Sequence, residues 1–345
     1  MRTIDWRDGR VVAIDQTRLP RELVTLEIDT VEELVDAIRR LAVRGAPAIG
    51  VAGALGVALA ARQHPDDPAA LTRAAMAIRA ARPTAVNLAW AVDRVLARRA
   101  DGVEAMTDEA VAILTEDVKC CLDLSERGAQ WLVETVGPAV AVQTHCNAGA
   151  LATVEWGTAL GVVRSLHERG ALTHVYASET RPLLQGARLT VWELADIGVP
   201  HTLVVDSAAA SVLARGLAHA VVVGADRITA NGDVVNKVGT YPLALAAARA
   251  GVPVVVAAPE STIDLATPTG RDVDIEVRGS DEVVTVGSVP LAPDGTATLN
   301  YAFDVTPADL VTAIVTERRL ILPSAGGRPD DATANRPDDE TGSRP

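Results

Sequence analysis

Cysteine and aromatic residues are scarce in this chain. It has three cysteines in 345 residues, with Cys120 and Cys121 adjacent and no C-x-x-C pair. This number and spacing argue against a disulfide framework or a zinc site, so we expect no metal and a reducing, cytoplasmic compartment. Aromatic residues make up 3% of the chain while hydrophobic residues make up 48%. A large core is therefore expected, built mainly from Ala, Val, Leu and Ile.

Positive charge is also in short supply. The chain has 32 Lys and Arg against 45 Asp and Glu, a net charge of −13. Nucleic-acid binding usually needs a basic face, so we expect no nucleic-acid partner. A few arginines can still form a local pocket for an anionic small molecule. The charged N-terminus lacks the apolar segment of a signal peptide, and the longest uncharged run, between Arg44 and Arg62, is short and rich in Ala and Gly. We therefore expect no membrane span.

Several well-known ligand-binding motifs are missing. The sequence contains no G-x-G-x-x-G, no G-x-x-x-x-G-K-[ST], no H-E-x-x-H and no G-x-S-x-G. These absences argue against a dinucleotide-dependent oxidoreductase, a P-loop protein, a zinc protease and a serine hydrolase of the usual kinds. We expect no cofactor.

The first 135 residues have mostly helical patterns. Residues 4–14 predict a hairpin with its turn at Asp8-Gly9. The sequence Thr30-Val31-Glu32-Glu33 is a capping box that predicts a helix through Arg40. Helical patterns continue to residue 135. We predict a mainly helical N-terminal domain over residues 1–135.

From residue 138 onward, short apolar runs alternate with helical patterns. The runs are at residues 140–144, 174–177, 202–205, 220–223 and 253–257, with helices near 153–168, 183–196, 208–216 and 240–250. This alternation is typical of a doubly wound parallel sheet. Residues 136–324 therefore predict an α/β domain, with a further helix at 307–317. Residues 325–345 are rich in Gly, Pro, Asp and Arg and predict a disordered tail.

Two polar residues follow apolar strands of the predicted sheet. Cys146 comes after the run at 140–144 and before a predicted helix, where backbone N–H groups and the helix dipole favour a thiolate. A buried cysteine that only fills space is the alternative. Asp226 follows the run at 220–223, where desolvation would raise its pKa and suit a general acid. Arg227 would oppose that rise if the side chains meet, and a loop-capping aspartate is the alternative.

Other residues near predicted strand ends and helix starts could bind an anion. Arg44 precedes a Pro-containing helix start, and Asn236 and Lys237 also precede a helix. Arg82 is either an anion contact or a solvated charge, and Gln185 either faces a ligand or is an ordinary helix residue. Ligands bind beyond the carboxyl ends of parallel strands, so this combination indicates proton transfer on a phosphorylated small molecule.

Six stretches, taken together, resemble one family. They are VRGAPAIG, RPTAVNL, THCNAGALAT, SETRPLLQGARLTVWEL, GADRITANGDVVNKVGTYPLA and TPADLVTAIVTE. In this order they are similar to the methylthioribose-1-phosphate isomerase family, which is shared with the alpha, beta and delta regulatory subunits of eukaryotic translation initiation factor 2B. The resemblance implies a helical N-terminal domain, a Rossmann-like C-terminal domain without a nucleotide cofactor, and a homodimer. It implies isomerisation of 5-methylthioribose 1-phosphate to 5-methylthioribulose 1-phosphate in methionine salvage.

The resemblance also implies roles for particular residues. It gives Cys146 and Asp226 as catalytic, so we expect both to face one pocket. The substrate-binding residues that it implies are Arg44, Gly45, Ala46, Arg82, Gln185, Asn236 and Lys237. Two related alternatives stay open: a ribose-1,5-bisphosphate isomerase, which needs a second phosphate site, and a non-enzymatic regulatory subunit.

Overall fold

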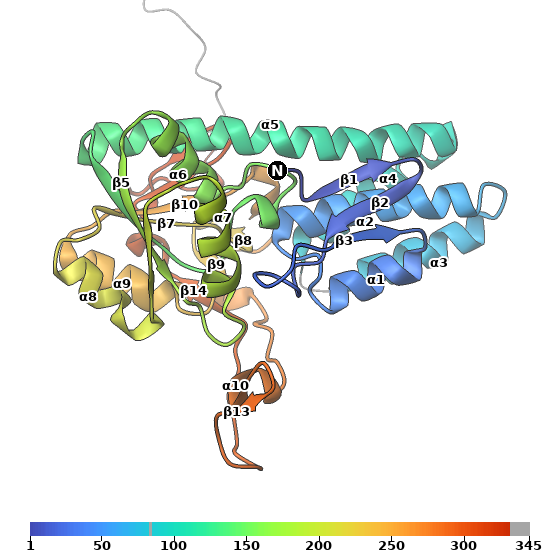
Figure 1. The fold of residues 1–345 in the computed structure, drawn as a ribbon. Coiled ribbons are helices and arrows are strands. Elements are labelled where there is room, and N and C mark those ends of the chain that lie inside the picture. The colour runs from blue at the N-terminus through green and yellow to red at the C-terminus, as the bar shows by residue number, and fades with distance from the viewer. Residues whose placement is uncertain (83–84, 332–345) are drawn as a thin grey trace, which may run out of the picture.

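The computed structural model describes residues 1–82 and 85–331. Its N-terminal part is a small antiparallel sheet followed by a group of helices (Figure 1). The predicted hairpin is present, with Ile4 opposite Ala13, and so is the predicted capping box, in which Thr30 and Glu33 bond each other's backbone. The elements are β1 (Ile4–Arg7), β2 (Arg10–Ile14), β3 (Thr25–Ile28), α1 (Val31–Arg39), α2 (Ala46–Gln63), α3 (Pro68–Arg79), α4 (Val86–Leu96) and α5 (Val103–Val136).

Helix α2 is the centre of the N-terminal core. It packs against α4 and α5, and glycines allow the close approach: a Cβ on Gly53 would lie 2.5 Å from Leu88 Cδ1. By length and composition alone α2 could cross a membrane, yet 83% of it is buried inside the protein. An apolar helix buried in this way is the core helix of a globular protein.

The C-terminal part is built on a seven-stranded sheet with the order β16-β15-β10-β7-β4-β5-β6. Every pair is parallel except β15 with β16. The whole chain therefore has the predicted fold class, with a mainly helical N-terminal part followed by a Rossmann-like parallel sheet. The strands are β4 (Val140–Thr144), β5 (Leu172–Ser178), β6 (His201–Val204), β7 (Ala220–Val223), β10 (Val254–Ala257), β15 (Ala313–Val315) and β16 (Leu320–Ile321).

Helices cover both faces of this sheet. On one face, Leu124 and Leu132 of α5 and Leu166 of α6 pack in one core with β4 and β7. On the other face, Leu213 of α8 and Leu243 of α9 form a separate core with the same sheet. The covering helices that follow α5 are α6 (Ala159–Glu168), α7 (Val191–Asp196), α8 (Ala209–Ala214) and α9 (Thr240–Ala250).

The predicted helix at residues 307–317 is wrong. This segment forms only a short 3₁₀ turn, η7 (Ala308–Leu310), and then strand β15, which pairs with β10 through Val255 and Ala313. Its apolar spacing resembles a helix, but Ile314 and Val315 are β-branched and fit a fully buried strand beside β10.

A second sheet and a projecting arm complete the fold. The sheet has the order β11-β8-β9-β14, and the arm extends away from the body in Figure 1. Its elements are β8 (Arg227–Thr229), β9 (Val234–Lys237), β11 (Ile263–Asp264) and β14 (Phe303–Thr306), and the arm carries α10 (Asp281–Val284), β12 (Thr285–Val286) and β13 (Val289–Pro290).

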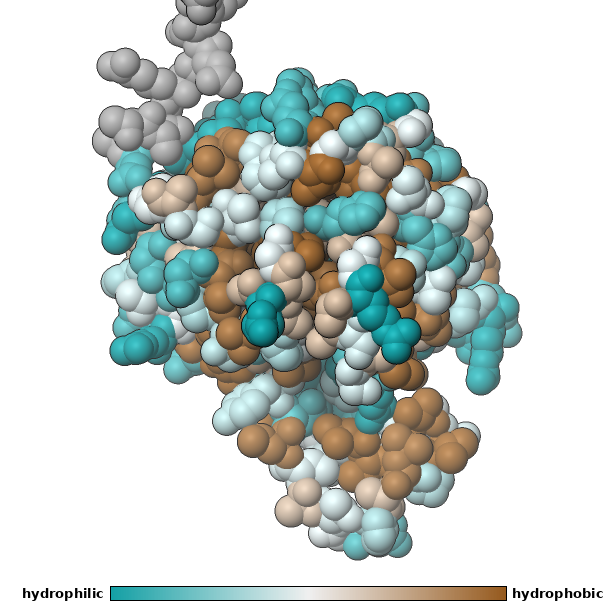
Figure 2. All heavy atoms as spheres, turned by 90° about the vertical axis from the view of Figure 1, so that its left-hand side faces the viewer, coloured by the Kyte–Doolittle hydropathy of each residue, from teal (hydrophilic) through white to brown (hydrophobic). Residues whose placement is uncertain are grey.

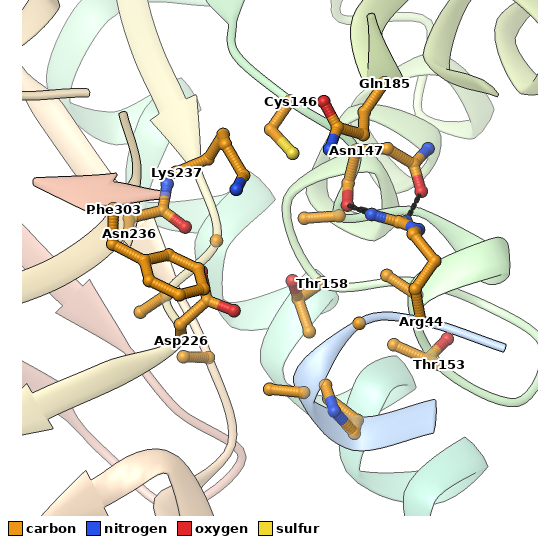
Figure 3. A pocket seen from close by; sticks show the side chains of 18 of the residues that line it. Arg44, Cys146, Asn147, Thr153, Thr158, Gln185, Asp226, Asn236, Lys237 and Phe303 are labelled. Atoms are coloured by element: carbon orange, nitrogen blue, oxygen red, sulfur yellow. Dashed lines mark hydrogen bonds between the residues drawn. The ribbon is translucent and has the colours of Figure 1, made fainter. Parts of the chain in front are cut away.

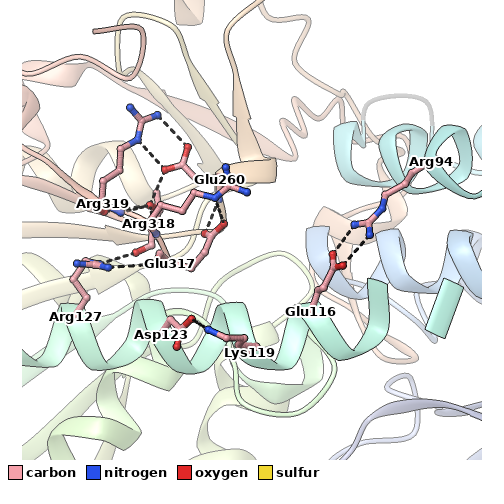
Figure 4. Close-up of polar contacts among 10 residues, drawn as sticks. Arg94, Glu116, Lys119, Asp123, Arg127, Glu260, Glu317, Arg318 and Arg319 are labelled. Carbon is pink, nitrogen blue, oxygen red and sulfur yellow. Dashed lines mark hydrogen bonds and ion pairs between the residues drawn. The ribbon is translucent and has the colours of Figure 1, made fainter. Parts of the chain in front are cut away.

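Helix α5 braces the two parts of the chain (Figure 4). Toward the N-terminal helices, Arg94 of α4 pairs with Glu116 at 2.6 Å. Toward the sheet, Arg127 donates to the carbonyl oxygen of Glu317 at 3.2 Å. The predicted boundary at 135/136 falls at the end of this helix, which supplies residues to both cores.

Part of the predicted disordered tail has a defined place beside the sheet. Arg319 pairs with Glu260 at 2.8 Å and donates to the carbonyl oxygen of Pro329 at 3.2 Å. The prediction for residues 332–345 lies outside the described residues.

Candidate active site

All nine residues that the sequence singled out line one pocket (Figure 3). The pocket lies between the start of α2 and the carboxyl ends of β4 and β7, with β9 along one side, and its open volume is about 750 Å³. The nine residues come from chain segments that are far apart in sequence. The residues are Arg44, Gly45, Ala46, Arg82, Cys146, Gln185, Asp226, Asn236 and Lys237.

Cys146 occupies a strained turn at the end of β4. Its φ is +60°, a left-handed conformation that is rare for residues other than glycine and is often stored at functional sites. Two threonines hold the turn: the Cys146 N–H donates to Thr180 Oγ1 at 2.8 Å, and Thr190 Oγ1 donates to the Cys146 carbonyl at 2.6 Å. The expected helix near residue 153 begins only at Ala159, so the turn rather than a helix terminus positions the thiol.

Asp226 extends from the loop after β7 into the same pocket. Removal from water raises the pKa of its carboxyl group, and the positive charges of Lys237 and Arg44 oppose this rise without cancelling it. The rise in the pKa of Asp226 has the direction that the sequence predicted. Arg227 pairs with Asp264 at 3.2 Å on β11.

Strand β9 places Asn236 and Lys237 in the pocket wall. Lys237 is 6% exposed, donates from Nζ to the Ala302 carbonyl at 2.7 Å and lies 4.5 Å from the centre of the Phe303 ring. Burial lowers the pKa of Lys237. Asn236 Nδ2 donates to Thr240 Oγ1 at 3.0 Å, which fixes its amide.

Arg44 is held by a polar network that the sequence analysis missed. Its Nε donates to Gln16 Oε1 at 3.0 Å, and its Nη1 donates to the Asn147 carbonyl at 3.1 Å. The Asn147 amide in turn donates to the buried Glu193 at 2.7 Å. Glu193 also accepts the N–H of Ala150 at 2.6 Å. The Glu193 side chain therefore holds the loop that contains Asn147, and Asn147 in turn holds Arg44.

The first turn of α2 is open to an anion. Gly45 precedes the helix with φ +93°, and it offers no side chain to cap the first N–H groups. A Cβ on Gly45 would lie 2.5 Å from Ala152 Cα, so a side chain does not fit there. Uncapped helix N-termini bind phosphate through their N–H groups and dipole.

Gln185 precedes an unusual helical turn. It is 7% exposed, and its Oε1 has no hydrogen-bond partner among the residues that the structure describes. The π-helix Gly186–Thr190 follows it directly. A side chain on Gly186 would collide with the Ser178 carbonyl, so glycine is needed where this turn meets β5. π-turns of this kind recur at functional sites.

Two pocket residues, Arg278 and Phe303, were not predicted from the sequence, and His145 also lines the pocket. Arg278 lies at the base of the arm, outside every motif noted in the sequence, and Phe303 is an aromatic neighbour of Lys237. His145 lines the pocket and donates from Nε2 to the Val238 carbonyl at 2.8 Å, and burial lowers its pKa, which favours the neutral imidazole.

Within residues 1–82 and 85–331, no group of three or more His, Cys, Asp or Glu side chains is arranged to hold a metal ion. The arrangement combines a thiol, a carboxylic acid and several cations, which suits acid–base chemistry on a phosphorylated molecule.

Comparison with known proteins identifies the family. The Initiation factor 2 subunit family matches residues 42–323, and the chain belongs to this family. The chain is 52% identical over 323 residues to a methylthioribose-1-phosphate isomerase from Anaeromyxobacter sp., covering 93% of this chain and 94% of that protein.

Two more similarities agree. A probable bifunctional methylthioribose-1-phosphate isomerase/methylthioribulose-1-phosphate dehydratase from Nocardia farcinica is 52% identical over 95% of this chain, which spans 61% of that longer protein. The crystal structure of 5-methylthioribose 1-phosphate isomerase from Pyrococcus horikoshii has a TM-score of 0.85 and 40% identity. That match covers 93% of this chain and 92% of the other.

Proposed function

We propose that this protein is an aldose–ketose isomerase that converts 5-methylthioribose 1-phosphate to 5-methylthioribulose 1-phosphate in methionine salvage. The observation that carries the proposal is the pocket itself, whose lining includes both Cys146 and Asp226 beside the uncapped start of α2. Relatives of similar length that carry this activity in their names support it.

The substrate's chemistry explains the need for an acid. A phosphate on C1 locks the sugar as a cyclic acetal. No free aldehyde forms, so the ordinary aldose–ketose route is blocked until the ring opens. Opening needs a proton on the ring oxygen. Asp226 is suited to donate it, because burial raises its pKa in the direction that a general acid needs.

The second half of the reaction moves hydrogen from C2 to C1. Cys146 is proposed to relay this proton through an enediol, and a direct hydride shift is the competing route. Reaction in deuterated water separates them: solvent deuterium at C1 supports the relay, and its absence supports the hydride shift.

The substrate phosphate is proposed to bind the first turn of α2 together with Arg44 and Lys237. Arg82, Gln185 and Asn236 complete the set of proposed substrate contacts. A neighbouring cavity shares Arg44, Arg82 and Asp226 with the pocket, and the rest of its lining is partly apolar, which suits a methylthio group at C5. The apolar side chains include Ile49, Ala85, Val235, Ile275 and Phe303.

Turnover of 5-methylthioribose 1-phosphate by the pure protein tests the proposal. Cys146→Ser and Asp226→Asn should each lower kcat by at least about 100-fold, the usual contribution of a positioned acid or base. Cys120→Ser is the matched control, because Cys120 is a free cysteine outside this pocket, and it should keep its turnover. No turnover by the unaltered protein would favour a regulatory role like that of the initiation-factor subunits.

A homodimer in the cytoplasm is proposed for the working enzyme. The face carrying α8 and α9 shows broad apolar areas in Figure 2. Leu203, Val205, Leu217 and Leu245 are each between 44% and 54% exposed there or at the adjacent edge strand β6. Apolar surface of this kind is typical of a protein–protein interface. Light scattering should give twice the mass of one chain, and a monomer would contradict the proposal.

A further inference from the structure

The pocket's positive charges fall into two groups. Among the described residues, the basic side chains lining it are Arg44, Arg82, Lys237 and Arg278. Arg44 and Lys237 are held by uncharged partners: Arg44 by Gln16 and Asn147, and Lys237 by a backbone carbonyl and an aromatic ring. Their two positive charges therefore face the ligand without a bonded carboxylate.

Arg82 and Arg278 are different, because they share one carboxylate. Arg82 Nη2 lies 3.1 Å from one oxygen of Glu276, and Arg278 Nε lies 3.1 Å from the other. Although partial burial opposes it, the charges of Arg278 and Arg82 hold the pKa of Glu276 below its usual range. Glu276 is thus a carboxylate at neutral pH.

These charges match one phosphate rather than two. A phosphate monoester carries about two negative charges near neutral pH, which Arg44 and Lys237 balance. A second phosphate would add about two more negative charges and would be left with Arg82 and Arg278, whose joint positive charge Glu276 already halves. We propose that Glu276 is a specificity-determining residue that restricts this pocket to sugar monophosphates and rejects sugar bisphosphates. This inference rests on the proposed function and deepens it.

A purely structural role is the competing explanation. Arg278 also lies 3.6 Å from Glu282 on the arm, and Asn300 donates to Glu282 at 3.0 Å. Glu276 could simply help to hold the base of the arm. The two carboxylates differ in one respect: Glu276 pairs with both Arg278 and Arg82, whereas Glu282 pairs with Arg278 on the arm side. Glu282→Gln is therefore a matched control.

Glu276→Gln removes the charge and keeps the shape of the side chain. The repulsion that it relieves grows with the charge on the ligand and falls with distance, so a bisphosphate whose second phosphate lies near Arg82 and Arg278 gains more than a monophosphate. The two arginines also become available to a second phosphate. We expect the preference for bisphosphate over monophosphate to rise at least about tenfold.

Calorimetric titration tests this directly. Ribose 1-phosphate and ribose 1,5-bisphosphate are titrated into Cys146→Ser, into Cys146→Ser with Glu276→Gln, and into Cys146→Ser with Glu282→Gln. The Cys146→Ser background is chosen to suppress conversion of either sugar. The ratio of the two Kd values should shift at least about tenfold with Glu276→Gln and less than about twofold with Glu282→Gln.

An unchanged ratio in the Glu276→Gln protein, or an equal shift in both variants, overturns the inference. Thermal unfolding of each variant shows that the fold is retained. Failure of the proposed function has a separate signature, because it appears as absent turnover of 5-methylthioribose 1-phosphate by the unaltered protein, whatever the two Kd values show.

Discussion

The backbone conformation of Gly45 determines where helix α2 begins, and the first turn of this helix is the proposed phosphate site. It precedes α2 with φ +93°, and a Cβ there would lie 2.5 Å from Ala152 Cα and 2.6 Å from the Ala152 carbonyl oxygen. Both neighbours are backbone atoms, which cannot turn aside as a flexible side chain could. Gly45→Ala must therefore move the start of α2, and Arg44 with it, away from the Cys146 loop.

Gly102 provides the matched control. It also precedes a helix, α5, with φ +97°, and a Cβ there would meet nothing within 4 Å. Gly102→Ala should lower the free energy of unfolding by about 1–3 kcal/mol, the cost of holding alanine in a positive-φ, extended conformation that is normally restricted to glycine. Gly45→Ala adds the steric conflict, typically about 1–3 kcal/mol, and should cost about 2–6 kcal/mol in all.

Urea unfolding and steady-state kinetics measure the two effects. Gly45→Ala should be less stable than Gly102→Ala and should raise KM for 5-methylthioribose 1-phosphate about tenfold or more, because the anion-binding turn is displaced. Gly102→Ala should leave KM unchanged. Equal losses of stability in the two variants would refute the close approach of α2 to Ala152. A destabilised Gly45→Ala protein with an unchanged KM would refute phosphate binding at the first turn of α2.

Two further predictions concern buried carboxylates. Burial raises the pKa of Asp117 from 3.8 to about 7, so the folded state binds its proton more tightly, and stability should fall as pH rises from about 4 to 7. Asp117→Asn should therefore be more stable than the unaltered protein above pH 7, by at most about 4 kcal/mol, and this gain should vanish toward pH 4. Urea unfolding of the two proteins at a series of pH values measures the gain and its loss. Glu193→Ala should lose about 2–5 kcal/mol of unfolding free energy, because it removes the acceptor of the Ala150 N–H and one of the two acceptors of the Asn147 side-chain amide. It should also raise KM, and an unchanged KM would show that Glu193 does not help to position Arg44.

The sequence predicted the elements whose local pattern and tertiary role agree. The hairpin at residues 4–14, the capping box at Thr30 and the buried parallel strands are all present. The segment at 307–317 failed because helical spacing and a short buried strand look alike, and only pairing with β10 decides between them.

Some residues of the candidate site could be predicted from the sequence and others could not. Cys146 and Asp226, which follow strands β4 and β7, could be placed at one edge of the sheet from the order of elements alone. The sequence predicts Lys237 just before a helix, and the structure places it within β9 of the second sheet. Glu193 and Arg278 could not be placed from the sequence. Glu193 lies within a helix, Arg278 lies at the base of an irregular arm, and each reaches the site only through contacts between distant segments.

The central claim is that Cys146 and Asp226 act on one substrate in one pocket. The most direct measurement is turnover of 5-methylthioribose 1-phosphate by the unaltered protein, Cys146→Ser and Asp226→Asn, with substrate Kd measured for both variants. The account predicts turnover by the unaltered protein and losses of at least about 100-fold in kcat for each variant, with Kd changed less than about threefold. Turnover that persists near its normal rate in either variant would contradict it.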